Sequence, residues 1–121
     1  MRLNHDCIRD ILLYIEENIT DSKPIIEADE ILAYLQHKYD IDTINYHIRQ
    51  IDKAKLVDKV SYAENVPYFI CDLSWDGHVY VDNIRDNKIW NKLKDATKHL
   101  TSVSLPVLIE KAPDIAKYFI K

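Results

Sequence analysis

A chain of 121 residues with 47% hydrophobic and 30% charged residues is large enough for one folded domain, and this composition excludes a disordered or fibrous protein. The formal net charge of −4 means that the whole molecule repels phosphate, so a nucleic-acid partner would have to meet a local basic patch. No apolar run approaches the ~20 residues that cross a bilayer, and acidic residues interrupt the N-terminal stretch. We therefore expect a cytoplasmic protein with no signal peptide and no membrane partner.

The first predicted helix follows Asn4, whose side chain is a good N-cap. Its apolar residues recur at the helical period and form one stripe: Cys7, Ile8, Ile11, Leu12, Ile15 and Ile19. The breaker cluster "TDSKP" ends this helix, and the "PII" that overlaps its end favours a short edge strand. A second helix is expected over residues 28–38, with Ile31, Leu32 and Leu35 facing inward.

A third helix is predicted from Thr43 to Ala54, after the tight turn "YDID". In this turn Asp42 is the expected N-cap, and Ile41 is expected to pack into the core between the two helices. The inward positions of the third helix are Ile44, His47, Ile48, Ile51 and Ala54, and its opposite stripe is polar: Asn45, Tyr46, Arg49, Gln50 and Lys53. Two short helices joined by a tight turn, the second with a polar outer face, have helix-turn-helix geometry.

Two strands are predicted next, over residues 56–62 and 68–73, with "AENVP" between them. In the second strand Phe69, Cys71 and Leu73 share one face of the sheet. A hairpin directly after a helix-turn-helix corresponds to a wing.

The only glycine of the chain, Gly77, lies in the first turn of a fourth predicted helix, for which Ser74 is the N-cap and Trp75 the first residue. A glycine inside a helix costs roughly 1 kcal/mol relative to alanine. We therefore predict that Gly77 lets this helix pack closely on a neighbour rather than contact a ligand. Structural roles are accordingly assigned to Ser74, Trp75 and Gly77.

Residues 87–121 are predicted to form a C-terminal helical extension of a domain that spans residues 1–86. The stretch "NKIWNKLKDATKHL" predicts a helix with Trp90 beside its inward stripe, which consists of Ile89, Leu93, Ala96 and Leu100. Ser104 caps a last segment, which Pro113 should kink or restart. Because this segment is apolar over a wide arc, it needs cover from its own domain or from a partner. The extension is thus expected to pack on the domain or to form a homodimer interface.

The order helix, strand, helix, turn, helix, hairpin, helix resembles the winged helix-turn-helix superfamily. The stretches "HIRQIDKAKLVDKV" (47–60) and "LSWDGHVYVDNIRD" (73–86) are similar to the segments where such proteins leave the recognition helix and the wing. The resemblance implies a mainly α protein with a small β-hairpin, of the α+β class. Winged helices usually carry a glycine where this chain has Lys55, which leaves the geometry of that turn open.

More narrowly, the chain up to about Lys94 resembles an uncharacterised family of small bacterial and prophage proteins. Their shared elements are Trp-x-Gly-His, aliphatic-Asp-x-Ile-Arg and Ile-Trp-Asn. Here the elements correspond to Trp75, Gly77 and His78, to Val81, Asp82, Ile84 and Arg85, and to Ile89, Trp90 and Asn91. This resemblance implies no particular activity.

The leading hypothesis for function is DNA binding by a small bacterial or prophage transcriptional regulator that reads the major groove with the helix Thr43–Ala54. Arg49, Asn45 and Gln50 can form bidentate hydrogen bonds with base edges, and Tyr46 lies on the same stripe. Phosphate contacts are expected from Thr43, Lys53, Lys55 and Lys59. The alternative is an ordinary solvated helix face, because four aspartates surround the same surface: Asp40, Asp42, Asp52 and Asp58.

A second hypothesis is a protein–protein interaction module that keeps the winged-helix frame and does not bind DNA. The predicted tip of the wing, residues 63–66, contains Glu64 and Asn65 but no basic residue that could contact phosphate. The apolar C-terminal segment supports the same alternative.

An enzyme is not expected. The histidines are scattered without metal-ligand spacing, no catalytic triad is suggested, and a single glycine excludes a glycine-rich phosphate loop. Cys7 and Cys71 are predicted to be buried thiols, with a disulfide as the less favoured alternative. The sequence therefore predicts no catalytic residue, no metal and no cofactor.

Overall fold

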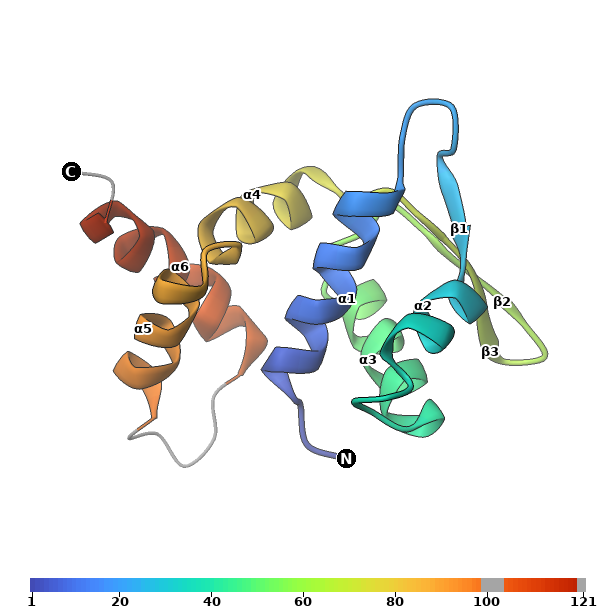
Figure 1. The fold of residues 1–121 in the computed structure, drawn as a ribbon, viewed down its shortest axis with the longest axis horizontal. Helices are drawn as coiled ribbons and strands as arrows, with labels where there is room; N and C mark the ends of the chain where they lie inside the picture. The colour runs from blue at the N-terminus through green and yellow to red at the C-terminus, as the bar shows by residue number, and fades with distance from the viewer. Residues whose placement is uncertain (99–103, 120–121) are drawn as a thin grey trace.

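The computed structural model describes residues 1–98 and 104–119, without the side chains of residues 118 and 119. Within these residues the fold is mainly helical α+β, with six helices and one three-stranded antiparallel sheet (Figure 1). The elements follow the chain as α1 (His5–Asn18), β1 (Ile25–Glu27), α2 (Ala28–Leu35), α3 (Ile41–Lys53), β2 (Val60–Ala63), β3 (Val66–Cys71), α4 (Trp75–Ile84), α5 (Asn87–Thr97) and α6 (Leu105–Phe119). None of the described helices is long and apolar enough to cross a bilayer.

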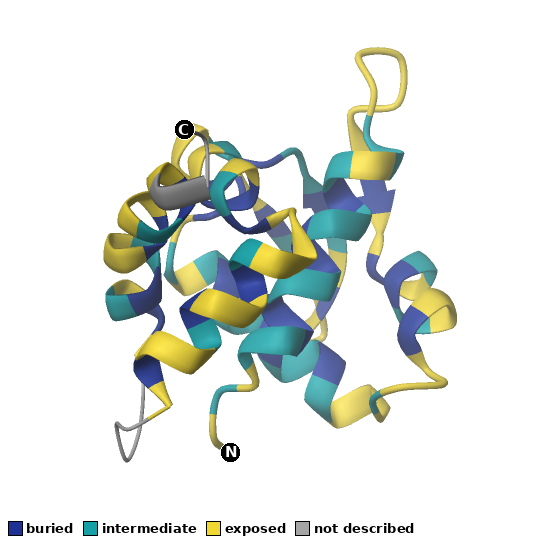
Figure 2. Cartoon of the chain, turned by 60° about the vertical axis from the view of Figure 1, so that its left-hand side comes forward, coloured by how far each residue is buried: buried dark blue, intermediate teal, exposed yellow. Residues whose placement is uncertain are grey.

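Helix α1 runs through the centre of the molecule, with α2, α3 and the sheet on one side and α4, α5 and α6 on the other (Figure 1). Asn4 caps α1 as predicted, because its Oδ1 accepts a hydrogen bond of 3.1 Å from the Cys7 amide. The predicted apolar stripe is buried, apart from Ile19, which is half-buried. Figure 2 shows the buried residues gathered between α1 and the elements around it. A stripe of this kind explains why a short helix is stable here, since packing of an apolar face stabilises helices more than propensity does.

The connection between α2 and α3 differs from the prediction. Helix α2 ends at Leu35 and α3 begins at Ile41, with Asp40 rather than Asp42 as its N-cap: Asp40 Oδ1 accepts a 2.7 Å hydrogen bond from the Thr43 amide. Ile41 is 60% exposed, so its predicted place in the core is wrong. Instead Tyr39 packs against the core.

The sheet has the order β1-β3-β2, and the predicted edge strand is confirmed as β1. Ile26, Ile70 and Val60 are paired across the three strands and buried on the same face. Strand β2 begins four residues later than predicted, because Leu56 and Val57 are buried in the connection from α3 instead of in the strand.

Two tight turns place residues other than glycine in the left-handed region of the backbone. Glu64 (φ 53°) and Asn65 (φ 66°) connect β2 to β3, as expected for a two-residue hairpin turn with positive φ at both central positions. Lys55 has φ 59° directly after α3. Its amide donates to Asp52 O (3.0 Å) and the next amide, of Leu56, donates to Ile51 O (3.1 Å), which is the Schellman arrangement that usually ends in glycine. The turn at Lys55 therefore has the backbone geometry that usually requires glycine, although the residue is lysine.

The predicted close approach at Gly77 is confirmed. A Cβ at this position would lie 1.9 Å from the backbone oxygen of Leu56. Ser74 caps α4 as predicted by accepting a 3.0 Å hydrogen bond from the Gly77 amide, and its hydroxyl donates to Lys55 O (2.6 Å). The start of α4 is thus held against the end of α3. Trp75, however, is 82% exposed, so the structural role predicted for it is wrong: its ring makes little contact with the rest of the chain.

Helices α5 and α6 pack against α4 and against each other. In α5 the buried positions are Trp90, Leu93 and Thr97, whereas Ala96 is exposed and Ile89 only half-buried, so the predicted inward stripe is rotated toward Trp90. Leu100 lies outside the described residues. Ser104 caps α6, which continues through Pro113, and the apolar residues that α6 buries against its own chain are Leu105, Leu108, Ala112 and Ala116.

Candidate nucleic-acid interface

The outer face of α3 is the surface on which the sequence places the candidate ligand contacts. Ile44, His47, Ile48 and Ile51 are buried, and the polar stripe therefore lies on the opposite side. Helix α6 packs on α4 and α5, on the far side of α1, so the described part of the C-terminal extension does not cover this stripe (Figure 1). In this stripe Lys53 is exposed, and the other four residues are half-buried: Asn45, Tyr46, Arg49 and Gln50.

Arg49, in the middle of the stripe, is engaged by the β2–β3 hairpin. Its Nη2 donates to the backbone oxygen of Asn65, and its guanidinium lies 5.4 Å from the ring centre of Tyr62. The Tyr62 hydroxyl in turn donates to Asp52 (2.6 Å); burial and this carboxylate raise the pKa of Tyr62 to about 12. These contacts fasten the hairpin to α3. Arg49 must exchange a protein partner for a base in order to read DNA.

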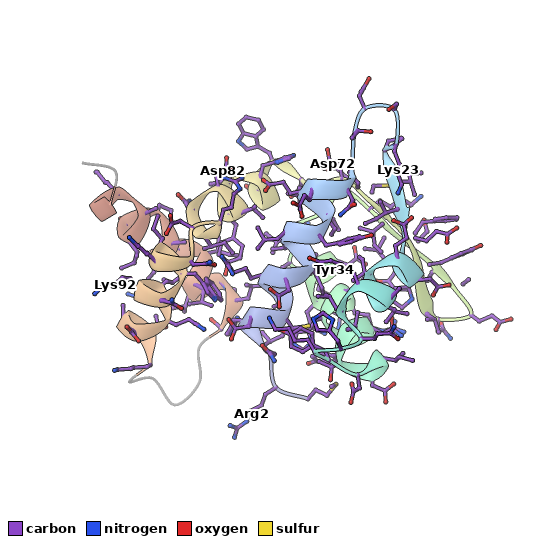
Figure 3. The ribbon with its side chains drawn as sticks, viewed as in Figure 1. Arg2, Lys23, Tyr34, Asp72, Asp82 and Lys92 are labelled. Atoms are coloured by element: carbon purple, nitrogen blue, oxygen red, sulfur yellow. The ribbon has the colours of Figure 1, made fainter. Side chains whose placement is uncertain are left out.

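The N-terminal residues lie along the same helix. The Tyr46 hydroxyl donates to the backbone oxygen of Met1 (3.1 Å), and the Asn4 amide donates to His47 Nε2 (2.8 Å). His47 Nδ1 is 2.7 Å from Thr43 O, so the ring is neutral with its proton on Nδ1. Burial lowers the pKa of His47, which favours this neutral form. Arg2, which follows Met1, has an exposed side chain that points away from the rest of the molecule (Figure 3).

The other predicted contacts divide into constrained and free side chains. Thr43 belongs to the helix cap, where its hydrogen bonds lower the pKa of Asp40. Asn45 is half-buried, and its Oδ1 is buried without a hydrogen-bond partner among the described residues. Within the described chain, four predicted contacts have side chains with no hydrogen bond or ion pair: Gln50, Lys53, Lys55 and Lys59. Exposed acids on the same side reduce the positive charge of the surface: Asp42, Asp58 and Glu64.

A second group of polar residues joins α1 to α4 and α5, and we call it the α1–α4–α5 junction. Arg9 donates to Ile84 O (2.8 Å), Arg85 O (2.7 Å) and Asn87 Oδ1 (2.8 Å), so it pairs with carbonyls that the end of α4 leaves open. Arg85 is hydrogen-bonded to Glu16 and to Asp82, and these bonds raise its pKa.

Trp90 completes the junction. Its Nε1 donates to Asp6 (2.7 Å), which also accepts from Lys94 (3.1 Å). Although burial raises the pKa of Asp6, the hydrogen bonds from Trp90 and Lys94 hold it below the ordinary value. Several residues of the Asp-x-Ile-Arg and Ile-Trp-Asn elements thus serve helix packing. Arg9 and Asp6 were not predicted from the sequence. The pattern that could have indicated them is a charged residue beside the apolar stripe of α1, at a position that faces later helices.

The described residues hold no group of three or more His, Cys, Asp or Glu side chains that could bind a metal. Cys7 and Cys71 are free thiols, as predicted; Cys7 is buried and Cys71 half-buried.

Comparison with known proteins places the chain in a family. Residues 2–104 match the DUF2513 family, described as hypothetical protein. An uncharacterised protein of Haemophilus influenzae is 30% identical over 122 residues, which cover 99% of this chain and 96% of that protein. No solved structure matches. The resemblance to an uncharacterised family with bacterial members is confirmed, and the chain belongs to the DUF2513 family.

Proposed function

We propose that the protein is a winged helix-turn-helix DNA-binding protein, a small transcriptional regulator of the cytoplasm that presents α3 to the major groove. Two features of the fold support this assignment. The elements from α1 to β3 follow the order of a winged helix, and the sheet has the antiparallel order β1-β3-β2. Helices α2 and α3 are separated by a short turn, and the hairpin that follows is the wing.

The observation that carries the proposal is that the polar stripe of α3 is left uncovered by the described C-terminal helices. Gln50 and Lys53 project from this stripe without protein partners and can reach a base edge and a phosphate. Arg49 reaches a guanine by releasing Asn65. Lys55 and Lys59, both exposed, add positive charge in the connection that follows α3.

The exposed acidic side chains near α3 repel phosphates, so we expect a modest affinity for DNA. Each phosphate contact that is lost should lower the slope of log affinity against log salt by about 1. Specific binding then depends more on base contacts and DNA shape than on a large basic surface.

The proposal is tested by measuring binding to random duplex DNA at low and moderate salt for the wild type and for an Arg49→Ala, Lys53→Ala double variant. We expect salt-sensitive binding that the double variant weakens at least about tenfold. The matched control is Lys88→Ala, Lys92→Ala, which removes two exposed lysines from α5. Binding that is absent in the wild type, or that the control weakens as strongly, contradicts the proposal.

A protein–protein interaction module on the same frame is the second candidate, favoured by the highly exposed ring of Trp75. A homodimer through the C-terminal segment stays a prediction, although the described apolar residues of α6 already have cover from α4 and α5. Retention of a protein partner by a chain that shows no DNA binding favours this candidate.

A further inference from the structure

Helix α4 carries apolar side chains on the face that points away from the molecule. Its buried residues, Gly77, Tyr80, Val81 and Ile84, occupy one side. Trp75 and Val79, one turn apart on the opposite side, are 82% and 44% exposed. Burial of a tryptophan ring removes a large apolar area from water, and tryptophan is one of the residues enriched at the centre of protein interfaces.

Acidic side chains border this apolar pair, and we call the whole the α4 patch: Asp72, Trp75, Asp76, Val79 and Asp82. Figure 3 shows Asp72 and Asp82 on the same edge of the molecule, on the two sides of the start of α4. The nearby basic groups neutralise this border only in part. Arg85 is shared between Asp82 and Glu16, and His78, 3.9 Å from Asp72, forms an ion pair only when it is protonated.

We propose that the α4 patch binds a basic amphipathic segment of another protein, whose apolar side chains cover Trp75 and Val79 and whose lysines or arginines face the aspartates. The charge of the border selects this occupant. DNA is disfavoured because its phosphates meet like charge. A second copy of the chain is disfavoured because a two-fold contact would bring Asp72, Asp76 and Asp82 opposite their own counterparts.

The α4 patch is separate from the outer face of α3, and the inference does not depend on DNA binding. Ser74, at the start of α4, is hydrogen-bonded to Lys55 at the end of α3. The start of the α4 patch is therefore joined directly to the end of α3.

The test uses two labelled synthetic peptides of about four helical turns, one with leucines and lysines at amphipathic spacing and one with glutamates in place of the lysines. We expect the wild-type protein to bind the leucine–lysine peptide more tightly at low salt than at moderate salt, and to bind the leucine–glutamate peptide at least about tenfold more weakly. Trp75→Ser should weaken binding of the leucine–lysine peptide about tenfold or more, and Asp76→Asn should weaken it less.

The matched control is Tyr34→Ser, which removes a 55% exposed aromatic ring from α2 and should leave peptide binding unchanged. Circular dichroism shows whether each variant is folded. Because Trp75 and Tyr34 are both exposed, we expect both variants to fold as the wild type does. The proposal is overturned if Trp75→Ser and Tyr34→Ser affect binding equally, or if the leucine–glutamate peptide binds as well. The proposal is also overturned if sedimentation shows that the wild type is a dimer and that Trp75→Ser dissociates it, because the occupant of the patch is then a second copy of the chain.

Discussion

The α1–α4–α5 junction and the outer face of α3 are both rich in charged and polar side chains, but these side chains have different partners. In the junction Arg9, Arg85 and Asp6 each make two or more hydrogen bonds to other parts of the chain. On α3, Gln50 and Lys53 make none within the described chain. Polar side chains that hydrogen-bond to distant parts of the chain stabilise the fold, whereas polar side chains without such partners are available to a ligand.

Arg49 lies between these two cases, because it belongs to the α3 face but is held by the hairpin. The comparison therefore predicts which substitutions cost stability and which cost binding. Residues of the junction should affect unfolding, and residues of the free stripe should affect only a ligand.

The largest effect on the free energy of unfolding is expected at Gly77, where the start of α4 packs against the connection that follows α3. In Gly77→Ala the new methyl group would lie 1.9 Å from the Leu56 backbone oxygen, and a backbone atom in a tight turn cannot move aside cheaply. We expect a loss of about 3 kcal/mol in the free energy of unfolding, measured by urea denaturation. Val79→Ala on the exposed side of the same helix is the control and should change stability by about 0.5 kcal/mol or less. Similar values for both variants would show that α4 does not pack against this connection.

The next largest effect on stability compares one residue of the α1–α4–α5 junction with one residue of the outer face of α3. Arg9→Met keeps the aliphatic stem but removes the hydrogen bonds to Ile84, Arg85 and Asn87, so we expect a loss of about 2 kcal/mol. Lys53→Met removes an exposed charge without a protein partner and should cost about 0.5 kcal/mol or less. Both are read from chemical denaturation under the same conditions. If the two variants unfold alike, the contrast between the regions is wrong.

Much of the fold follows from local patterns. The apolar stripe of α1, the buried side of α3 and the packing role of Gly77 could be predicted because each depends on helical period or on one residue type. The N-cap of α3 could not, since "YDID" offers two aspartates two residues apart. The choice depends on Tyr39, which packs against the core and donates to Asp10 of α1 (2.7 Å), and this contact spans 29 residues.

The same reason explains the errors at the C-terminal end and at the site. Trp90, toward which the buried side of α5 is rotated, donates a hydrogen bond to Asp6, 84 residues away in the chain, and no local pattern contains that contact. The polar stripe of α3 was predicted from period alone, but the engagement of Arg49 by Asn65 and of Tyr46 by Met1 depends on tertiary structure. Periodicity therefore predicts which side of a helix is polar, and not which of its side chains are free.

The smallest expected effect is an increase in the free energy of unfolding, and it concerns the turn at the end of α3. Lys55 has φ 59° in a Schellman turn, a conformation that costs a residue with a Cβ roughly 1 kcal/mol and costs glycine almost nothing. Lys55→Gly should therefore raise the free energy of unfolding by about 0.5 to 1 kcal/mol, after the larger freedom of glycine in the unfolded chain is subtracted. Lys53→Gly, two residues earlier and still helical, is the matched control and should lower it by about 1 kcal/mol. Opposite signs for two neighbouring lysines would locate the left-handed residue at position 55, whereas a loss in both variants would mean that the turn after α3 has another geometry.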